Sequence, residues 1–141
     1  MIHYVDATVA LYAASRAQRY KTAAVDVLRA IASGQLEAVT SAAVIEDIMY
    51  RFGGLGRPEE GLEIADQFMR VVPIVYDLAP VDLSRSLALM RAEPRLPFRI
   101  ALHGAIVANR GITTVITAET AYDLLSGCTR VDLASWGATA G

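Results

Sequence analysis

The stretch Ile2-His3-Tyr4-Val5-Asp6-Ala7-Thr8-Val9 decides the fold. It has the character of a short apolar strand that ends at a lone aspartate, Asp6, and then passes into an apolar helical run. In an open parallel sheet, ligands bind in the crevice outside the carboxyl ends of the strands. A buried carboxylate without a partner is costly. We therefore expect Asp6 to belong to a metal site, a phosphate-binding site or a structural ion pair.

The composition indicates one ordinary globular domain. The chain has 141 residues, of which 54% are hydrophobic and 20% charged, so it has enough apolar surface for a core and is not disordered. A net charge of −2 argues against bulk electrostatic binding of nucleic acid. Cys128 is the only cysteine, which excludes an intramolecular disulfide and fits a reducing, cytoplasmic compartment. No apolar run reaches the roughly 18 residues needed to span a bilayer.

Strand-like and helix-like patterns alternate along the chain. We expect strands at about 2–6, 36–40, 71–76, 113–117 and 130–133. We expect helices at about 8–14, 20–33, 42–52, from Pro58 onward, and at 80–92 and 98–110. This alternation predicts an α/β domain with a parallel sheet over residues 1–136, followed by a frayed tail at 137–141.

Single residues sharpen these boundaries. Ser41 is a good N-cap for the helix that follows it, and Pro58 suits the first turn of the next helix. Pro73 cannot donate a backbone hydrogen bond, so its strand is expected to be short or at an edge. Gly53-Gly54-Leu55-Gly56 follows a helix and lacks the Gly-Lys-Ser/Thr ending of a phosphate loop, so it indicates a helix end.

Three acids fall at related places in this pattern. Asp6 ends the first strand, Glu46 lies in the helix after the second, and Glu119 follows the strand at 113–117. In a doubly wound sheet the three can face one crevice. Carboxylates bind Mg²⁺ together with water and phosphate oxygens, and such a site suits phosphodiester hydrolysis. The alternative is that each acid is a solvated charge on a helix flank or loop.

The order and spacing of these motifs resemble the PIN-domain family, in particular VapC-type toxins of toxin–antitoxin pairs. The resemblance covers nearly the whole chain. It is carried by Tyr4-Val5-Asp6-Ala7-Thr8-Val9, Ala38-Val39-Thr40-Ser41, Val44-Ile45-Glu46-Asp47-Ile48, Ala101-Leu102-His103-Gly104-Ala105 and Ala118-Glu119-Thr120-Ala121-Tyr122-Asp123.

The resemblance implies a three-layer α/β/α domain with a central parallel sheet of about five strands. It also implies a metal-dependent endoribonuclease that uses Mg²⁺ or Mn²⁺, cleaves single-stranded RNA, forms a homodimer and is inhibited by a cognate antitoxin protein. Asp6, Glu46 and Glu119 match acids of the family's metal site. Thr8 stands where its hydroxyl would position a water or orient the carboxylate.

One position departs from the family pattern. The third acid is expected at residue 100, which is isoleucine here. Three interpretations remain open. The site works with its metal affinity completed by RNA phosphates; another acid, Glu93 or Asp123, substitutes; or the domain is a catalytically impaired relative that binds RNA or an antitoxin-like partner.

Other signals are secondary. Nearly all the positive charge is arginine, the better fork for phosphate, and Arg16, Arg19, Arg51 and Arg99 could form a rim that binds RNA. Their alternative is solvated surface charge. His103 on an apolar helix is expected to be a hydrogen-bonded core residue. A receiver-like phosphoacceptor domain is disfavoured, because the only lysine, Lys21, lies in the second helix.

Overall fold

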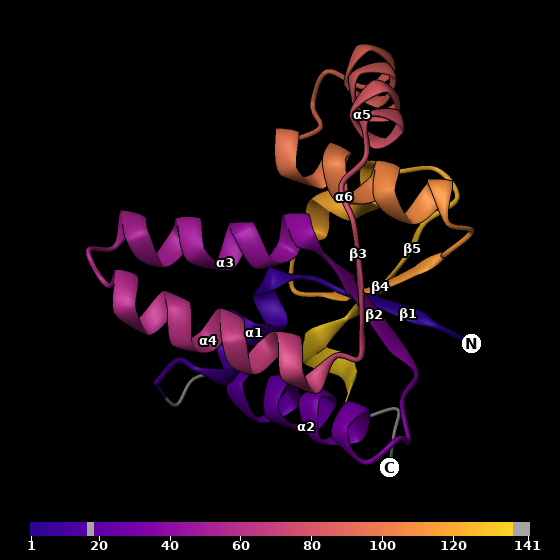
Figure 1. Ribbon diagram of the computed structural model, residues 1–141. Helices are drawn as coiled ribbons and strands as arrows, with labels where there is room; N and C mark the ends of the chain where they lie inside the picture. Colours follow the sequence, from indigo (N-terminus) through magenta and orange to yellow (C-terminus); the bar gives the residue numbers. More distant parts are fainter. Residues whose placement is uncertain (17–18, 137–141) are drawn as a thin grey trace.

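The computed structural model describes residues 1–16 and 19–136, in which strands and helices alternate along the chain (Figure 1). The strands are β1 (His3–Val5), β2 (Ala38–Ser41), β3 (Ile74–Tyr76), β4 (Thr114–Thr117) and β5 (Thr129–Asp132). The helices are α1 (Ala7–Ala13), α2 (Lys21–Ala32), α3 (Ala42–Gly54), α4 (Pro58–Val71), α5 (Pro80–Ala92) and α6 (Phe98–Asn109), with 3₁₀ turns η1 (Thr120–Leu124) and η2 (Leu133–Ser135).

All the strand pairs are parallel, and the sheet order is β3-β2-β1-β4-β5. The order reverses between β1 and β4, so this is the point at which crevices form in doubly wound sheets. Val5 is in register with Ile116. The next residues, Asp6 and Thr117, therefore emerge side by side at the carboxyl edge of the sheet.

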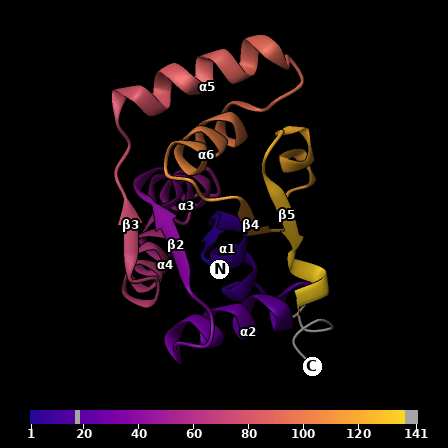
Figure 2. The same cartoon turned by 90° about the vertical axis from the view of Figure 1, so that its right-hand side faces the viewer.

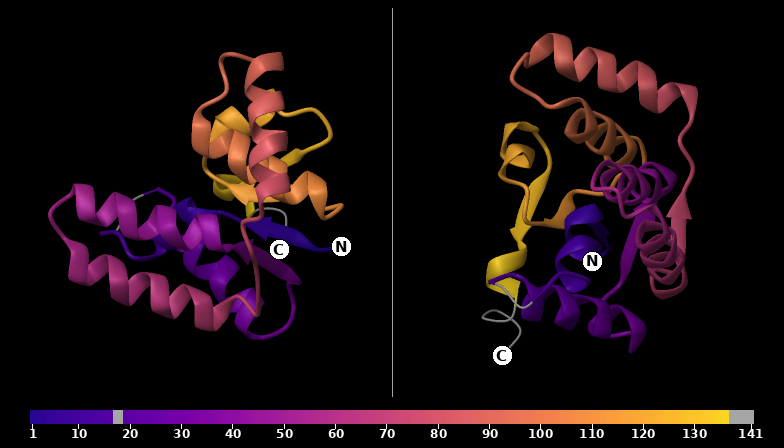
Figure 3. Two further views of the ribbon diagram at one scale, coloured as in Figure 1. Left: turned by 45° about the horizontal axis from the view of Figure 1, so that its top comes forward. Right: turned by 90° about the vertical axis from the view of Figure 1, so that its left-hand side faces the viewer.

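Helices cover both faces of the sheet. α5 and α6 lie on one side, and α1, α2 and α4 lie on the other (Figures 1 and 2). α3 and α4 run next to each other and are joined by a short turn (Figure 3). Gly56 takes a left-handed backbone conformation in that turn, with φ of 71°. This three-layer arrangement is the predicted one.

The central strands form the core. Every residue of β2 and β4 is buried, as are Tyr4 and Val5 of β1. Strands covered on both faces carry continuous apolar and β-branched runs, which explains the Thr114–Thr117 sequence. β3 is an edge strand that begins only at Ile74, because the expected strand residues Val71 and Val72 end α4 instead.

The predicted element boundaries are otherwise close to the observed ones. The Ser41 hydroxyl accepts a hydrogen bond from the Val44 amide, as expected of an N-cap. The expected tail at 137–141 lies outside the described residues. No helix within the described ranges combines the length and apolar character needed to span a bilayer.

Candidate active site at the carboxyl edge of the sheet

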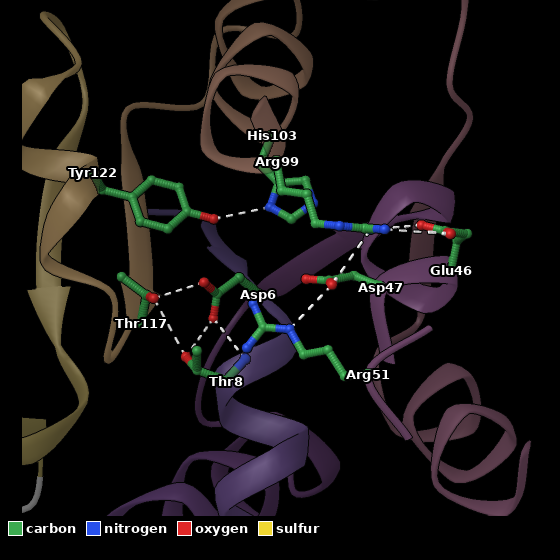
Figure 4. A network of polar contacts seen from close by, with 9 residues as sticks. All are labelled: Asp6, Thr8, Glu46, Asp47, Arg51, Arg99, His103, Thr117 and Tyr122. Carbon is green, nitrogen blue, oxygen red and sulfur yellow. Dashed lines mark hydrogen bonds and ion pairs between the residues drawn. The ribbon is translucent and has the colours of Figure 1, made fainter. Parts of the chain in front are cut away.

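Asp6 is held by hydroxyl groups at the end of β1. Its carboxylate accepts hydrogen bonds from the Thr8 amide at 3.0 Å, the Thr8 hydroxyl at 2.6 Å and the Thr117 hydroxyl at 2.6 Å (Figure 4). The side chain is 3% exposed. Burial raises the pKa of Asp6, while the hydrogen bonds from Thr117 and Thr8 act in the opposite direction.

The backbone fixes the direction of both hydroxyl protons. The Ala118 amide donates to the Thr8 hydroxyl oxygen at 3.0 Å, and the Glu119 amide donates to the Thr117 hydroxyl oxygen at 2.9 Å. Each hydroxyl therefore accepts from an amide and gives its proton to Asp6. Thr8 orients the carboxylate, which is one of its two predicted roles. Thr117 was missed, although it ends the strand expected at 113–117.

The acid that α3 turns inward is Asp47, and the prediction of Glu46 is wrong on this point. Asp47 is 1% exposed and extends toward Asp6, whereas the Glu46 side chain is 56% exposed (Figure 4). Asp47 follows Val44 by three residues, so it shares the apolar face of the helix. That spacing was the available signal.

Two arginines lie against these acids. Arg51 Nε donates to Asp47 Oδ1 at 3.1 Å, and Arg99 Nη1 lies 3.4 Å from the same oxygen. Arg99 also donates to Glu46 at 2.6 Å (Figure 4). The other carboxylate oxygen, Asp47 Oδ2, is buried and has no hydrogen-bond partner among the described residues. Of the predicted arginine rim, Arg51 and Arg99 thus reach the site, while Arg16 and Arg19 are exposed between α1 and α2.

Of the remaining predicted positions, one lines a pocket next to the site and the others do not. Glu119 lines a pocket together with Thr8 and Arg51. Ile100 is buried in the apolar core. The two acids considered as substitutes form ion pairs with other arginines: Asp123 pairs with Arg130, and Glu93 pairs with Arg95.

A buried histidine–tyrosine pair lies behind the acids. His103 Nδ1 is 3.0 Å from the Tyr122 hydroxyl, and His103 Nε2 has no partner within the described part of the chain. Burial lowers the pKa of His103 to about 4, so the ring is neutral at pH 7. Burial is the main cause that raises the pKa of Tyr122, and the nearby Asp6 charge raises it further. His103 is the core residue that was expected.

The buried acids fit a divalent cation, but with fewer carboxylate ligands than predicted. Within residues 1–16 and 19–136, no three His, Cys, Asp or Glu side chains are grouped to hold a metal ion, so the predicted trio of Asp6, Glu46 and Glu119 does not assemble. Two buried carboxylates, one with an unpartnered oxygen, remain. Mg²⁺ is commonly bound by one or two carboxylates, together with water and substrate phosphates. Asp6 and Asp47 could provide these two carboxylates.

Comparison with known proteins agrees with the motifs. No protein-family model matches the sequence. Ribonuclease VapC13 of Mycobacterium tuberculosis is 26% identical over 127 residues, covering 90% of this chain and 97% of the relative.

Several solved structures share the fold. VapBC2 from Rickettsia felis, solved bound to a promoter DNA fragment, has a TM-score of 0.72 at 12% identity and covers 94% of this chain and 98% of its own. VapC20 of M. tuberculosis, a toxin that cleaves the sarcin–ricin loop, has a TM-score of 0.62 at 19% identity and covers 82% and 87%. The resemblance to VapC-type PIN-domain proteins is thereby confirmed in sequence and in fold.

Proposed function

We propose that this chain, which has the fold and motif order of VapC-type PIN-domain proteins, is a cytoplasmic ribonuclease and the toxin of a toxin–antitoxin pair. One observation carries the proposal: the buried Asp47 side chain points toward Asp6 and one of its oxygens has no partner among the described residues (Figure 4). Burying two carboxylates at the switch point of a parallel sheet is costly. Hydrogen bonds hold Asp6 and two arginines lie against Asp47, yet one oxygen of Asp47 keeps no partner among the described residues, which favours a cationic ligand at this edge of the sheet. The name of the mycobacterial relative supports RNA as the substrate.

Asp6 and Asp47 would hold Mg²⁺ or Mn²⁺, and Glu119 is an acid of the adjoining pocket wall. When bound, the cation would activate water and neutralise charge on the scissile phosphodiester. Thr8 and Thr117 orient Asp6 by giving it both hydroxyl protons. Arg51 and Arg99 offer guanidinium forks to an incoming phosphate.

The partners form part of the same proposal. The R. felis structure is a VapBC complex, which supports an antitoxin protein as the partner of this chain. Single-stranded RNA as the substrate and a homodimer as the assembly follow from the resemblance alone, and we propose them on that basis.

A second candidate is a catalytically impaired module that binds RNA or a protein partner. Two observations favour it. The position expected to carry the third acid is the buried Ile100, and both arginines already neutralise Asp47. A site supplied with its own positive charge has less need of a metal ion.

Cleavage of a mixed pool of single-stranded RNAs, with and without Mn²⁺, separates the two candidates. The ribonuclease proposal expects Mn²⁺-dependent cleavage that Asp47→Asn and Asp6→Asn abolish. Asp66→Asn is the matched control, since it removes an exposed aspartate of α4 that pairs with Arg70 outside the site and should retain most of the activity. An inactive wild type together with an active Ile100→Asp variant would favour the impaired module. Cleavage that survives both aspartate substitutions would contradict the assignment of the site.

A further inference from the structure

A second feature adjoins the acids. A pocket of about 600 Å³ lies between α1, the carboxyl-terminal half of α3, the turn before α4 and the loop after β4. Two of its lining residues, Thr8 and Arg51, also contact Asp6 and Asp47 (Figure 4). The pocket therefore opens directly beside the two acids, and its volume is that of an ordinary small-ligand site.

Aromatic rings form part of the pocket wall. Tyr12 comes from α1, and Tyr50 and Phe52 come from α3. Tyr50 is 67% exposed, although the Arg99 guanidinium lies 4.7 Å from the centre of its ring. An exposed tyrosine beside a polar site is available to stack on a flat ligand. Stacking on aromatic side chains is the usual way in which proteins hold unpaired bases.

The charged residues of the wall suit a phosphate-bearing ligand. Arg51 and Arg57 contribute two positive charges, and Glu119 contributes one negative charge. Arg51 donates to Asp47 through Nε, and Arg57 donates two hydrogen bonds to the half-buried Glu60, at 2.7 and 2.6 Å. The Arg57 side chain is 53% exposed, and a phosphate offers it the same two-pronged acceptor geometry as the Glu60 carboxylate, so a phosphate can replace Glu60 as its partner.

We propose that this pocket, defined by Tyr12, Tyr50, Arg51, Arg57 and Glu119, binds one unstacked nucleotide of single-stranded RNA next to the scissile phosphate. This inference rests on the proposed ribonuclease function and gives that function a specificity site. The Tyr50 ring stacks on the base, and Arg51 and Arg57 contact the flanking phosphates. A base within a duplex is stacked and paired, so it cannot enter.

Binding measured without cleavage tests this site. A fluorescein-labelled 12-nucleotide single-stranded RNA of mixed sequence is titrated with the full chain in EDTA, its integrity is checked on a gel, and anisotropy gives Kd. Tyr50→Ala should weaken binding at least about fivefold, and Tyr50→Phe should restore it, because the phenyl ring still stacks. Arg57→Gln should weaken binding and reduce its dependence on salt. The blunt duplex of the same sequence should bind more weakly than the single strand.

Arg70→Gln is the matched control for Arg57, because Arg70 is an exposed α4 arginine paired with Asp66 and lies outside the pocket. It should bind RNA like the wild type. Wild-type-like affinity of Tyr50→Ala and Arg57→Gln would overturn the pocket and leave the ribonuclease proposal standing, provided that the wild type binds and cleaves RNA. A wild type that neither binds nor cleaves RNA would overturn both. Loss of a copurifying protein partner from Tyr50→Ala with RNA affinity intact would reassign the pocket to a peptide.

Discussion

Burial of His103 makes stability depend on pH. Its pKa is lowered to about 4, against 6.5 for an ordinary histidine. Between these values the unfolded chain binds a proton that the folded chain does not, so the stabilising contribution is complete above about pH 6.5 and is lost as the pH falls toward 4. From pH 7 to pH 5 the loss of unfolding free energy from this group is about 2 kcal/mol.

Urea unfolding at pH 7 and pH 5 checks this expectation. His103→Gln should remove most of the histidine-linked loss. His3→Gln is the control, because the pKa of His3 is also lowered by burial but this residue is only half-buried. The raised pKa of Asp6 acts with the opposite sign in all three proteins, so it cancels in the comparison. An equal loss in His103→Gln and the wild type would contradict the prediction.

A site residue could be predicted from the sequence only where its place at the end of a strand or on a helix face fixes its position. Asp6 follows directly from the end of an apolar strand. The choice between Glu46 and Asp47 depended on which residue shares a helical face with Val44 and Ile48, and the apolar spacing favoured Asp47. The ion pair between Arg99 and Glu46 joins residues 53 positions apart, and no local pattern encodes such a contact.

At the scale of elements, one glycine sets how closely α3 and α4 pack. A Cβ at Gly61 would lie 2.6 Å from the Cβ of Phe52, an atom fixed by its own backbone. Gly61→Ala should therefore lower the free energy of unfolding by roughly 1–3 kcal/mol through overpacking. Gly53→Ala is the matched control, since a Cβ there meets nothing within 4 Å and should stabilise helix α3 by up to about 1 kcal/mol. Thermal or urea unfolding distinguishes the two, and equal effects would contradict this packing argument.

The junction of α5 and α6 depends on a buried ion pair. Asp82, which is 0% exposed, accepts from Arg110 at 2.9 Å, from Asn109 at 2.8 Å and from the Ala79 amide at 2.9 Å. Burial acts to raise the pKa of Asp82, but these hydrogen bonds outweigh it and the pKa is lowered. Arg110→Met should cost roughly 3 kcal/mol, because it leaves a buried carboxylate without its counter-charge.

Denaturant unfolding of Arg110→Met measures that cost, and Arg70→Met provides the exposed comparison. The Arg70–Asp66 pair is exposed on both sides, so its loss should change stability by less than about 1 kcal/mol. Similar losses for the two variants would refute a special role for Asp82.

The elements themselves were more predictable than their contacts. α5 was expected at 80–92 and spans Pro80–Ala92, because a proline at its start and an Arg-Ala-Glu-Pro stop mark both ends locally. β3 was overextended because Val71 and Val72 have strand propensity, but Val71 lies in the last turn of α4 and Val72 is the C-cap of that helix. Tertiary packing of an amphipathic helix overrides propensity there.

At the scale of the whole molecule, the strand order of the sheet brings residues from distant parts of the chain together in one site. β1, β2 and β4 are neighbours and parallel, so Asp6, the start of α3 and the loop after β4 meet at one edge. α6 returns over that edge and brings Arg99 to Asp47. The site is therefore coupled to global stability, and any cation that binds only the folded chain must raise the melting temperature.

That coupling allows metal binding to be tested without catalysis. Arg99→Gln removes one positive charge from Asp47, and Ile100→Asp restores an acid at the position where the family resemblance expects one. Both should increase the rise in melting temperature caused by Mn²⁺. A tenfold tighter Kd adds about 1.4 kcal/mol at saturating metal, or roughly 4 °C for a chain of this size.

The matched control for Ile100→Asp is Ile106→Asp, an equally buried residue of α6 that packs with Ala43 and Leu102. Both variants should melt below the wild type without metal, since each buries an unpaired carboxylate. Only Ile100→Asp should recover on addition of Mn²⁺, because only that acid is expected to join Asp6 and Asp47 as a ligand. Equal recovery of the two variants, or none in either, would mean that position 100 contributes nothing to a metal site and that the arginines alone balance the charge of Asp47.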